Sequence, residues 1–311
     1  MSVEEPAREN SMLSQGNLSV RPRLPEWLKV KMPGSPRYIE LKQLMRGHQL
    51  HTVCEEAHCP NIGDCWDRGT ATFMILGDIC TRACRYCAVI TGRPTSLDLQ
   101  EPARLAETVK MMGLGYCVIT SVNRDDLADG GAFIFAACIN KIRTEVPACK
   151  VEVLIPDFAG SWAALQKVIA AQPNVLNHNI ETTRRVFHSV RPRGDYQLSL
   201  DLLAKVKELD PSLVTKSGII VGMGESKEEV IETMHDLRAV DCDLLTIGQY
   251  LRPSIKHIPM DRYYTPAEFD ELREIGEGLG FKHVASGPLV RSSYHADEQH
   301  DAVIASSSHR Q

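Results

Sequence analysis

Three cysteines lie within eight residues in the stretch CTRACRYC, residues 80–87. Cys80, Cys84 and Cys87 follow the spacing Cys-x3-Cys-x2-Cys, and thiolates this close on one loop can converge on one metal site. Four cysteines normally complete a four-iron cluster, but this run ends at three. Three ligands leave one iron open, much as a catalytic zinc keeps one non-protein position, so a substrate or cofactor can bind there. The missing fourth cysteine is therefore the functional feature of the stretch.

A second cysteine triplet precedes the first, in the stretch VCEEAHCPNIGDCW. Cys54, Cys59 and Cys65 follow the spacing Cys-x4-Cys-x5-Cys, again without a fourth cysteine nearby. A zinc ion could recruit His58 or His51 as its fourth ligand, so a structural zinc site is one interpretation. A second iron–sulfur cluster explains the pairing of two triplets better, and we adopt that interpretation.

The composition is that of a folded chain without a dominant charge. Of 311 residues, 43% are hydrophobic, which excludes disorder of the whole chain. The formal net charge of -5 is too small to indicate nucleic acid or a membrane as the main partner. No apolar run approaches the roughly 18 residues of a spanning helix, and the N-terminus lacks the apolar core of a secretory signal. Since clustered cysteines in a reducing compartment typically hold metal, we expect a cytoplasmic protein.

Apolar runs and helical patterns alternate from about residue 71 onwards. The apolar runs are typical of buried parallel strands, and they cover residues 71–77, 116–122, 150–156, 175–181, 214–223 and 243–251. Helical patterns occupy residues 101–113, 131–145, 161–172, 198–209, 227–239 and 266–279. Two of these helices begin with a capping box, formed by Ser226 with Glu229 and by Thr265 with Glu268. The alternation indicates a parallel α/β barrel or a doubly wound sheet.

The position of the first triplet suits the barrel interpretation. Strand-and-helix units fall two short of the usual eight, so the barrel would be incomplete and open on one side. Barrel enzymes carry their chemistry on the loops at the C-terminal strand ends. Because CTRACRYC comes directly after the first expected strand, the sequence places the triplet on that face.

The first triplet resembles the signature of the radical S-adenosylmethionine enzymes, which has this spacing and an aromatic residue, here Tyr86, before the last cysteine. The resemblance implies an incomplete (β/α)6 TIM-type barrel. It also implies that the open iron binds S-adenosylmethionine, which an electron from the cluster cleaves to methionine and a 5'-deoxyadenosyl radical. The segment GIIVGMGE, with Gly222, resembles the family's strand beside the adenine. The segment DGG, with Gly130 and Gly131, resembles the glycine-rich turn at the cofactor's amino group.

The early triplet together with RSSYHADE, residues 291–298, narrows the resemblance to the lipoyl synthase family. The resemblance extends from about residue 37 to residue 298, and the N-terminal arm and the tail add nothing to it. It implies that the early cysteines and one serine of RSSY hold an auxiliary four-iron cluster. We assign this role to Ser293, with Ser292 as the rival because the motif offers two adjacent hydroxyls.

The lipoyl synthase family inserts two sulfur atoms, at C6 and C8 of an octanoyl chain carried on a lysine of a carrier protein, and so forms the lipoyl cofactor. These carbons have no acidic hydrogen and no leaving group, so acid–base or nucleophilic side chains cannot open them. The resemblance implies that the adenosyl radical removes a hydrogen atom and that the auxiliary cluster donates the sulfur and is consumed. It implies three partners: an octanoylated lipoyl domain or glycine cleavage H protein, an electron donor such as ferredoxin or flavodoxin, and an iron–sulfur carrier that rebuilds the cluster.

Polar residues near the end of the fourth expected strand are further candidates for binding S-adenosylmethionine. Asn179 and Glu181 could contact its ribose or amino group, although a polar strand end would have the same composition. Arg193 could meet the cofactor's carboxylate or an acidic carrier domain, since an arginine fork matches a carboxylate. The same interpretation extends to nearby basic residues: Arg184, Arg185 and Arg191. A solvated basic face is the alternative.

The chain divides into four expected parts: a flexible N-terminal arm (1–36), an auxiliary-cluster segment (37–70), a partial barrel (71–284) and a C-terminal extension with the RSSY motif and tail (285–311). A radical enzyme that adds sulfur to dethiobiotin or to RNA is the nearest alternative. The pairing of an early triplet with a terminal RSSY argues against it, and an RNA-modifying enzyme would favour a basic appended domain. An electron carrier or a zinc-stabilised interaction protein would need neither a barrel-sized scaffold nor an open triplet.

Overall fold

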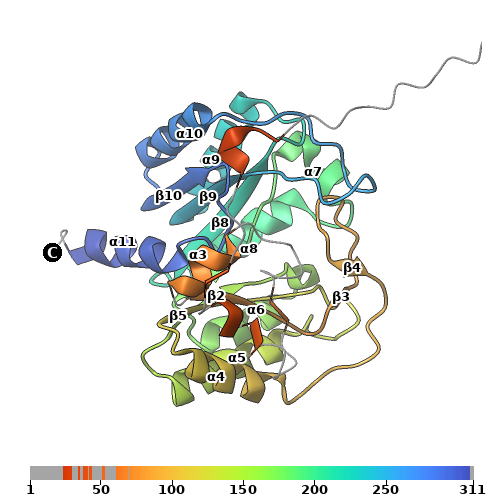
Figure 1. Cartoon of the computed structure of the whole chain (residues 1–311), viewed down its shortest axis with the longest axis vertical. Helices are drawn as coiled ribbons and strands as arrows, with labels where there is room; N and C mark the ends of the chain where they lie inside the picture. Colours follow the sequence, from red (N-terminus) through yellow and green to blue (C-terminus); the bar gives the residue numbers. More distant parts are fainter. Residues whose placement is uncertain are drawn as a thin grey trace, which may run out of the picture.

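One sheet of eight strands, in the order β1-β2-β5-β6-β7-β8-β9-β10, forms the framework of the chain (Figure 1). The computed structural model describes residues 24–29, 34–35, 38–40, 42–43, 51–52, 61–68 and 70–308. The strands of this sheet are β1 (His51–Thr52), β2 (Thr70–Ile75), β5 (Tyr116–Ser121), β6 (Lys150–Leu154), β7 (Val175–Asn177), β8 (Val214–Val221), β9 (Leu244–Gln249) and β10 (His283–Gly287). β1 pairs antiparallel with β2, and all other neighbours in the sheet are parallel. β3 (Ile79–Cys80) and β4 (Ile90–Thr91) form a separate parallel pair.

Helices alternate with the strands, and those that connect parallel strands of the sheet lie on its outer side (Figure 1). They are η1 (Glu26–Leu28), α3 (Ile62–Asp67), α4 (Glu101–Met112), α5 (Ala132–Glu145), η2 (Phe158–Gly160), α6 (Trp162–Ala170), α7 (Arg184–Val190), α8 (Tyr196–Leu209), α9 (Lys227–Ala239), α10 (Pro266–Gly278) and α11 (Ala296–Ser308). From β2 to β10 the strand order follows the chain, and within the described residues no pairing joins the two edges. The sheet is therefore an open partial barrel, as expected. Among the described helices, none combines the length and the apolar character that crossing a membrane requires.

The strands and helices expected from the sequence are present at the expected places. Both capping boxes form. The hydroxyls of Ser226 and Thr265 each accept a hydrogen bond from the backbone N–H of the glutamate three residues later, and the carboxylate of that glutamate accepts one from the backbone N–H of the serine or threonine. β7 is shorter than its apolar run, since the regular ladder ends at Asn177. The following residues still contact β8, through the His178 N–H to the carbonyl of Lys216 (3.0 Å) and a bridge from Glu181 to Ile219.

Several observed elements were not predicted, including the following strand and two helices. β10 adds a further parallel strand beside β9, and α7 and α11 are additional helices. The sequence of β10, HVASG, contains no apolar run. In the structure only Val284 among its residues is buried. α11 has the sequence ADEQHDAVIASSS, which shows no sustained apolar stripe.

Two apolar clusters hold the helices on the sheet. The larger one packs β2, β5 and β6 against α4, α5 and α6, and it buries Leu105, Ile119 and Phe135 completely. The second packs β8 and β9 against α8, α9 and α10, around Met234 and Phe269. Full burial of a side chain of this size contributes about 1.5–3 kcal/mol, so the strands form a rigid support for the loops at their ends.

A charged pair, Lys216 of β8 and Glu152 of β6, lies inside the barrel. Lys216 Nζ is 3.0 Å from Glu152 Oε1, and the two side chains are 0% and 1% exposed. The Tyr116 hydroxyl donates to Glu152 Oε2 (2.9 Å), and Asn177 Nδ2 donates to Oε1 (3.1 Å). Burial lowers the pKa of Lys216, and the carboxylate of Glu152 opposes that shift. The network links β5, β6, β7 and β8 through side chains alone.

Helix α11 covers the end of the barrel opposite to the first cysteine triplet. Its Val303 packs against Val175, Val214 and Leu244, which are the first residues of β7, β8 and β9. The helix therefore covers apolar strand starts that would otherwise face water.

Candidate functional site

A cavity of about 410 Å³ lies at the C-terminal ends of the parallel strands. Its volume falls within the ~300–1,000 Å³ range of small-molecule sites. Strands β2, β5, β6, β8 and β9 contribute to its wall, as do the segments that follow β7 and β10. The cavity thus occupies the face where a barrel enzyme carries its chemistry.

The first cysteine triplet lines this cavity, because Cys80, Cys84 and Cys87 all contribute to its wall. Cys80 ends β3, and its Sγ accepts hydrogen bonds from the backbone N–H groups of Arg82 (3.4 Å) and Asn123 (3.3 Å). Hydrogen bonds to cysteine sulfur stabilise the thiolate form and tune iron–sulfur clusters. The loop therefore presents its thiols to one space and supports one of them with backbone donors.

Burial affects the protonation of two of these thiols. Burial raises the pKa of Cys84, with Arg191 opposing the shift, and burial raises the pKa of Cys87 to about 12. Both thiols keep their protons at neutral pH until a metal displaces them. Across the part of the chain that the structure describes, no three His, Cys, Asp or Glu side chains are arranged around a single ion. A four-iron cluster needs no such arrangement, since each of its cysteines binds a different iron.

Arg82, between the first two cysteines of the triplet, fixes the loop to the barrel. Its guanidinium pairs with both oxygens of Asp157 (2.5 and 2.7 Å) and with both oxygens of Asp125 (2.8 and 2.9 Å for the shortest contacts). The side chain of Arg82 is 6% exposed and that of Asp157 is 2% exposed. Although burial acts to raise it, the hydrogen bonds from Arg82 lower the pKa of Asp157 to about 2. Arg82 therefore ties the cluster loop to the ends of β5 and β6.

A second loop, residues 250–258, rests on the triplet. The Ile258 N–H donates to the carbonyl of Arg85 (2.9 Å), and His257 Nε2 lies 2.9 Å from the carbonyl oxygen of Cys87. In Figure 1 this loop and the β3–β4 segment approach each other beside α7. The two loops together form one side of the cavity entrance.

The segment after β7 brings polar atoms into the cavity. Asn179 and Glu181 both line it, as the sequence suggested. Glu181 has a φ of 73°, which turns its backbone away from the strand. Asn179 Oδ1 is buried and has no hydrogen-bond partner among the described residues. Since an unpaired buried oxygen is costly, this atom fits a ligand donor, such as the amino group or ribose of S-adenosylmethionine.

Arg191, rather than Arg193, is the arginine that faces the cavity. Arg191 lines it, is 7% exposed, and donates from Nη1 to the carbonyl of Asn179 (3.1 Å). Its Nε has no partner among the described residues and can serve a carboxylate. Arg193 is exposed and donates to the carbonyl of Thr81 (3.1 Å). The sequence suggested both arginines. They lie two positions apart on one loop, and the path of this loop directs only Arg191 into the cavity.

The segment after β10 reaches the cavity by crossing β9. A Cβ at Gly248 would lie 2.1 Å from the carbonyl oxygen of Val290, so only glycine permits this crossing. Ser292 and Ser293 then line the cavity. Asn179 Nδ2 donates to the hydroxyl of Ser292 (3.0 Å), whereas no described residue hydrogen-bonds to the hydroxyl of Ser293. This difference supports Ser293 over Ser292 as the hydroxyl that is available to a metal.

The early triplet is described only at Cys65, because Cys54 and Cys59 lie outside the described residues. Cys65 is buried on α3, in the same apolar cluster as Tyr294 of the RSSY motif. Contacts between α3 and the start of α11 fix this pairing, since His295 Nε2 is 3.1 Å from Asp64 Oδ2 and Arg68 pairs with Glu298. The structure thus brings one early cysteine next to the C-terminal motif, across more than two hundred residues of chain.

Three glycines suggested as cofactor contacts do not line the cavity. Gly130 and Gly131 are close-packed instead: a Cβ would lie 2.9 Å from Phe158 and 2.3 Å from Leu76, respectively. Gly222 has a φ of 101° and packs against Gln249, which does line the cavity. Among the three, only Gly222 therefore has a residue of the cavity wall among its closest described neighbours.

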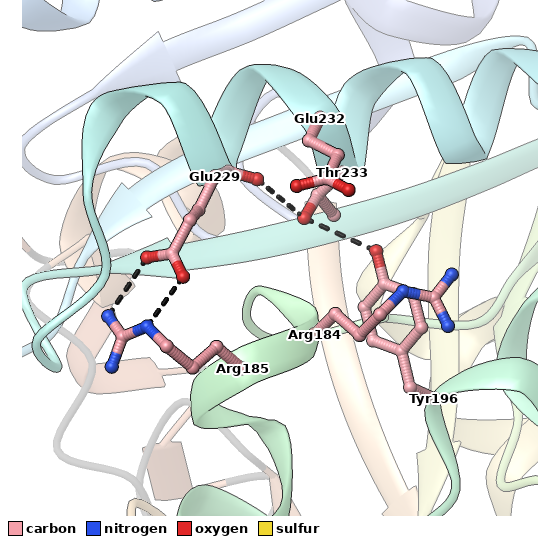
Figure 2. Close-up of a pocket in the computed structure, with 6 residues that line it drawn as sticks. All are labelled: Arg184, Arg185, Tyr196, Glu229, Glu232 and Thr233. Carbon is pink, nitrogen blue, oxygen red and sulfur yellow. Dashed lines mark hydrogen bonds and ion pairs between the residues drawn. The ribbon is translucent and has the colours of Figure 1, made fainter.

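A second, smaller cavity of about 200 Å³ lies between α7, α8 and α9 (Figure 2). Arg185 pairs with the carboxylate of Glu229 (2.6 Å), and Arg184 lies over the ring of Tyr196 at 4.3 Å (Figure 2). Arg184 also pairs with Asp236 (3.1 Å). Both arginines are occupied in the outer helical layer, so neither serves the main cavity.

Sequence reasoning missed two residues of the site. Arg82 lies inside the triplet, and its double ion pair depends on carboxylates 43 and 75 residues away, which no local pattern reveals. His178 lines the cavity, and burial lowers its pKa to about 4, so it is neutral at physiological pH. Its place directly before Asn179, at a strand end, was the only available signal.

A single methyl group added at Gly218 is expected to change the affinity for S-adenosylmethionine. A Cβ there would lie 2.8 Å from both Asn179 Oδ1 and Thr246 Oγ1, inside the cavity. Gly218→Ala is expected to weaken the binding of S-adenosylmethionine by about 10–200-fold, the range for one methylene in a tight pocket. Equilibrium dialysis with the cofactor would measure this. Gly278→Ala, where a Cβ meets nothing within 4 Å, is the control. Equal affinities in the two variants would contradict the position of the cofactor.

Comparisons with known proteins agree with this geometry. The family model described as "Radical SAM superfamily" matches residues 74–237, and the "N-terminal domain of lipoyl synthase of Radical_SAM family" matches residues 2–59. The second match corrects the expectation that the N-terminal arm carries no resemblance. Solved structures with the same fold include methylornithine synthase (PylB), at 14% identity and a TM-score of 0.53, over 77% of this chain and 73% of that one. HydG, a maturase of the [FeFe]-hydrogenase, matches with 14% identity and a TM-score of 0.55, over 86% and 71%.

Curated relatives match far more closely. The lipoyl synthase of Rubrobacter xylanophilus is 60% identical over 88% of this chain and 86% of its own length. That of Symbiobacterium thermophilum is 58% identical, over 91% and 88%. That of Roseiflexus sp. is 58% identical, over 89% and 92%. The chain therefore belongs to the lipoyl synthase family of radical S-adenosylmethionine enzymes, whose cofactors are S-adenosylmethionine and two four-iron clusters.

Proposed function

We propose that this chain inserts sulfur at C6 and C8 of an octanoyl group on a carrier-protein lysine, with the site residues in the roles given below. The observation that carries the proposal is the meeting of two segments in one cavity: the open triplet and the two serines of the C-terminal motif. A radical has to form next to the sulfur source, and the place of the triplet and the two serines in one cavity wall supports this proposal.

The residue roles rest on the family's cysteine motifs, and for the first triplet and Ser293 also on their place in the cavity wall. Cys80, Cys84 and Cys87 hold the first cluster, and Cys65, with Cys54, Cys59 and Ser293, holds the second. When bound, the first cluster supplies the electron that cleaves S-adenosylmethionine, and the second supplies the sulfur. The apolar part of the wall, which includes Val118, Leu154 and Ile219, excludes water and suits an octanoyl chain.

Polar residues at the same cavity would orient S-adenosylmethionine. Asn179 offers its unpaired Oδ1, and Arg191 offers its unpaired Nε to the carboxylate. Glu181 faces them, and burial raises its pKa while Arg191 opposes the shift. Tyr86 packs at this end of the cavity beside the triplet. The set contains both an acceptor for an ammonium group and a donor for a carboxylate, which is what the methionine part of the cofactor requires.

Ser293→Cys tests the role of the serine ligand. Oxygen is a harder ligand than thiolate for a sulfide-bridged iron, so a serine can release that iron as the cluster is used. Ser293→Cys is expected to retain iron but to slow sulfur insertion by about tenfold or more. Iron per chain and product mass would be measured together. Ser292→Ala, which removes only the bond to Asn179, is the matched control, and unchanged turnover of Ser293→Cys would contradict the assignment.

The partners and the location are part of the proposal. The carrier is a lipoyl domain or a glycine cleavage H protein, electrons come from a ferredoxin or flavodoxin, and an iron–sulfur carrier rebuilds the second cluster. No nucleic acid and no membrane takes part. A cytoplasmic location is supported by the radical triplet, since none of its three cysteines forms a disulfide.

Mass spectrometry of an octanoylated lipoyl domain tests the function directly. The iron-loaded protein would be incubated anaerobically with S-adenosylmethionine and a strong reductant. We expect a product with two added sulfur atoms. If 5'-deoxyadenosine forms and the octanoyl chain stays unchanged, the substrate assignment is wrong. If no 5'-deoxyadenosine forms and no sulfur is added, the residue roles are wrong.

A further inference from the structure

Basic residues are concentrated on three segments at the entrance of the main cavity. The segments 84–93, 188–194 and 250–260 contribute to this entrance or adjoin residues that line it, and they contain no aspartate or glutamate. We call their exposed basic residues the cationic rim: Arg85, Arg93, Arg193, Arg252 and Lys256. The whole chain has a formal net charge of -5, so this concentration of positive charge is local.

The residues of the cationic rim have no ion-pair partner in the described part of the chain, and they differ in this from many exposed basic residues elsewhere. Arg252 donates only to the carbonyls of Ile255 and His257, and Arg193 donates only to the carbonyl of Thr81, so their charges stay uncompensated. Elsewhere exposed basic side chains mostly pair with carboxylates: Lys29, Lys141, Lys167, Arg184, Arg185 and Arg262.

Exposed apolar side chains lie among these charges. Ile255 is 78% exposed and Ile90 is 63% exposed, on the two loops that flank the triplet. Arginine and exposed apolar groups together are typical of protein–protein interfaces. The loops are held in place, because Ile258 N–H and His257 bond to the backbone of the triplet loop. The surface is therefore preformed, which lowers the cost of docking.

We propose that the cationic rim docks the carrier protein through an acidic surface around its octanoylated lysine. This inference rests on the proposed function, because a substrate tethered to a folded domain can enter the cavity only if that domain sits at the entrance. Charge complementarity selects an acidic partner and steers it to the entrance. An electron donor needs no access to the cavity interior, so the entrance itself suits the carrier.

Charge reversal on the rim tests this proposal. Arg93→Glu with Lys256→Glu changes two rim side chains outside the cavity wall. Lys110→Glu with Lys150→Glu is the matched control, since these exposed lysines of α4 and β6 give the same change in net charge away from the cavity. The dissociation constant for an octanoylated lipoyl domain would be measured anaerobically with the iron-loaded protein and S-adenosylmethionine, at low and at moderate salt. We expect the rim variant to bind at least about tenfold more weakly, the control to bind as wild type, and the difference to shrink with salt.

A short octanoyl-lysine peptide separates this proposal from the proposed function. The rim variant should add sulfur to the peptide at the wild-type rate, because its cavity is unchanged. Equal dissociation constants for the rim and control variants would overturn the docking surface. The docking proposal would also be overturned by a rim variant that binds the carrier normally but accepts electrons from flavodoxin more slowly, since the rim would then serve the electron donor. Failure of wild-type protein to modify either substrate would instead overturn the proposed function, while the binding constants still decide the docking surface.

Discussion

Arg82→Met is expected to lower the free energy of unfolding by about 3–5 kcal/mol, the usual cost of removing one partner from a buried ion pair. The substitution leaves Asp157, which is 3% exposed, without its cation. It also releases the loop between Cys80 and Cys84, so iron at the first triplet and the yield of 5'-deoxyadenosine should fall together. Equilibrium urea unfolding, iron analysis and product analysis would measure the three effects.

Two further variants define what Arg82 contributes. Arg82→Lys keeps the charge but cannot form two forked pairs, so an intermediate loss is expected. Arg185→Met removes a forked pair that is exposed, with Glu229, and should change the free energy of unfolding little. A similar loss in Arg82→Met and Arg185→Met would show that the pairs at the triplet do not fix the loop.

The ion pair between Arg82 and Asp157 also predicts how the free energy of unfolding depends on pH. The pKa of Asp157 is about 2 in the folded chain and about 3.9 in an unfolded one, so the unfolded state binds the proton more readily. The stabilisation is complete above about pH 4 and is lost as the pH falls towards 2. The difference in unfolding free energy between wild type and Arg82→Met should therefore narrow over that range.

Lys216→Met is expected to destabilise the chain by about 3–5 kcal/mol as well, because it leaves the carboxylate of Glu152 buried without a cation. The double variant Lys216→Met with Glu152→Gln removes both charges and should lose less than the single variant. Lys141→Met is the control, since Lys141 and Glu145 form an exposed pair worth about 0.3–0.5 kcal/mol. Urea unfolding of wild type, Lys216→Met, Glu152→Gln and the double variant measures the coupling between the two side chains, and additive losses would contradict the network.

The sequence predicted the repeating part of the fold well. Strands such as β5 and β9 are rich in apolar residues, and the helices that begin at Ser226 and Thr265 carry their start signals locally. β10 escaped prediction because neighbouring strands and helices, rather than an apolar run of its own, define it. Local patterns suffice wherever burial is uniform along an element.

The site was predictable in residue type but not in orientation. The triplet and the strand-end residues Asn179 and Glu181 do reach one cavity. The choice between Arg191 and Arg193 depends on the path of a loop, and the role of Arg82 depends on two distant carboxylates. Spacing along the chain cannot supply either, because both arise from contacts between separate elements.

The contacts between α3 and α11 also set an order of events during synthesis. Arg68 pairs with a residue 230 positions later, and Asp64 with one 231 positions later. The early cysteine segment leaves the ribosome long before its C-terminal partner exists, so it has to wait for nearly the whole chain. The site proposed for the second cluster can therefore close only after Glu298 has been made, and a chain that ends before this residue is unable to form these contacts.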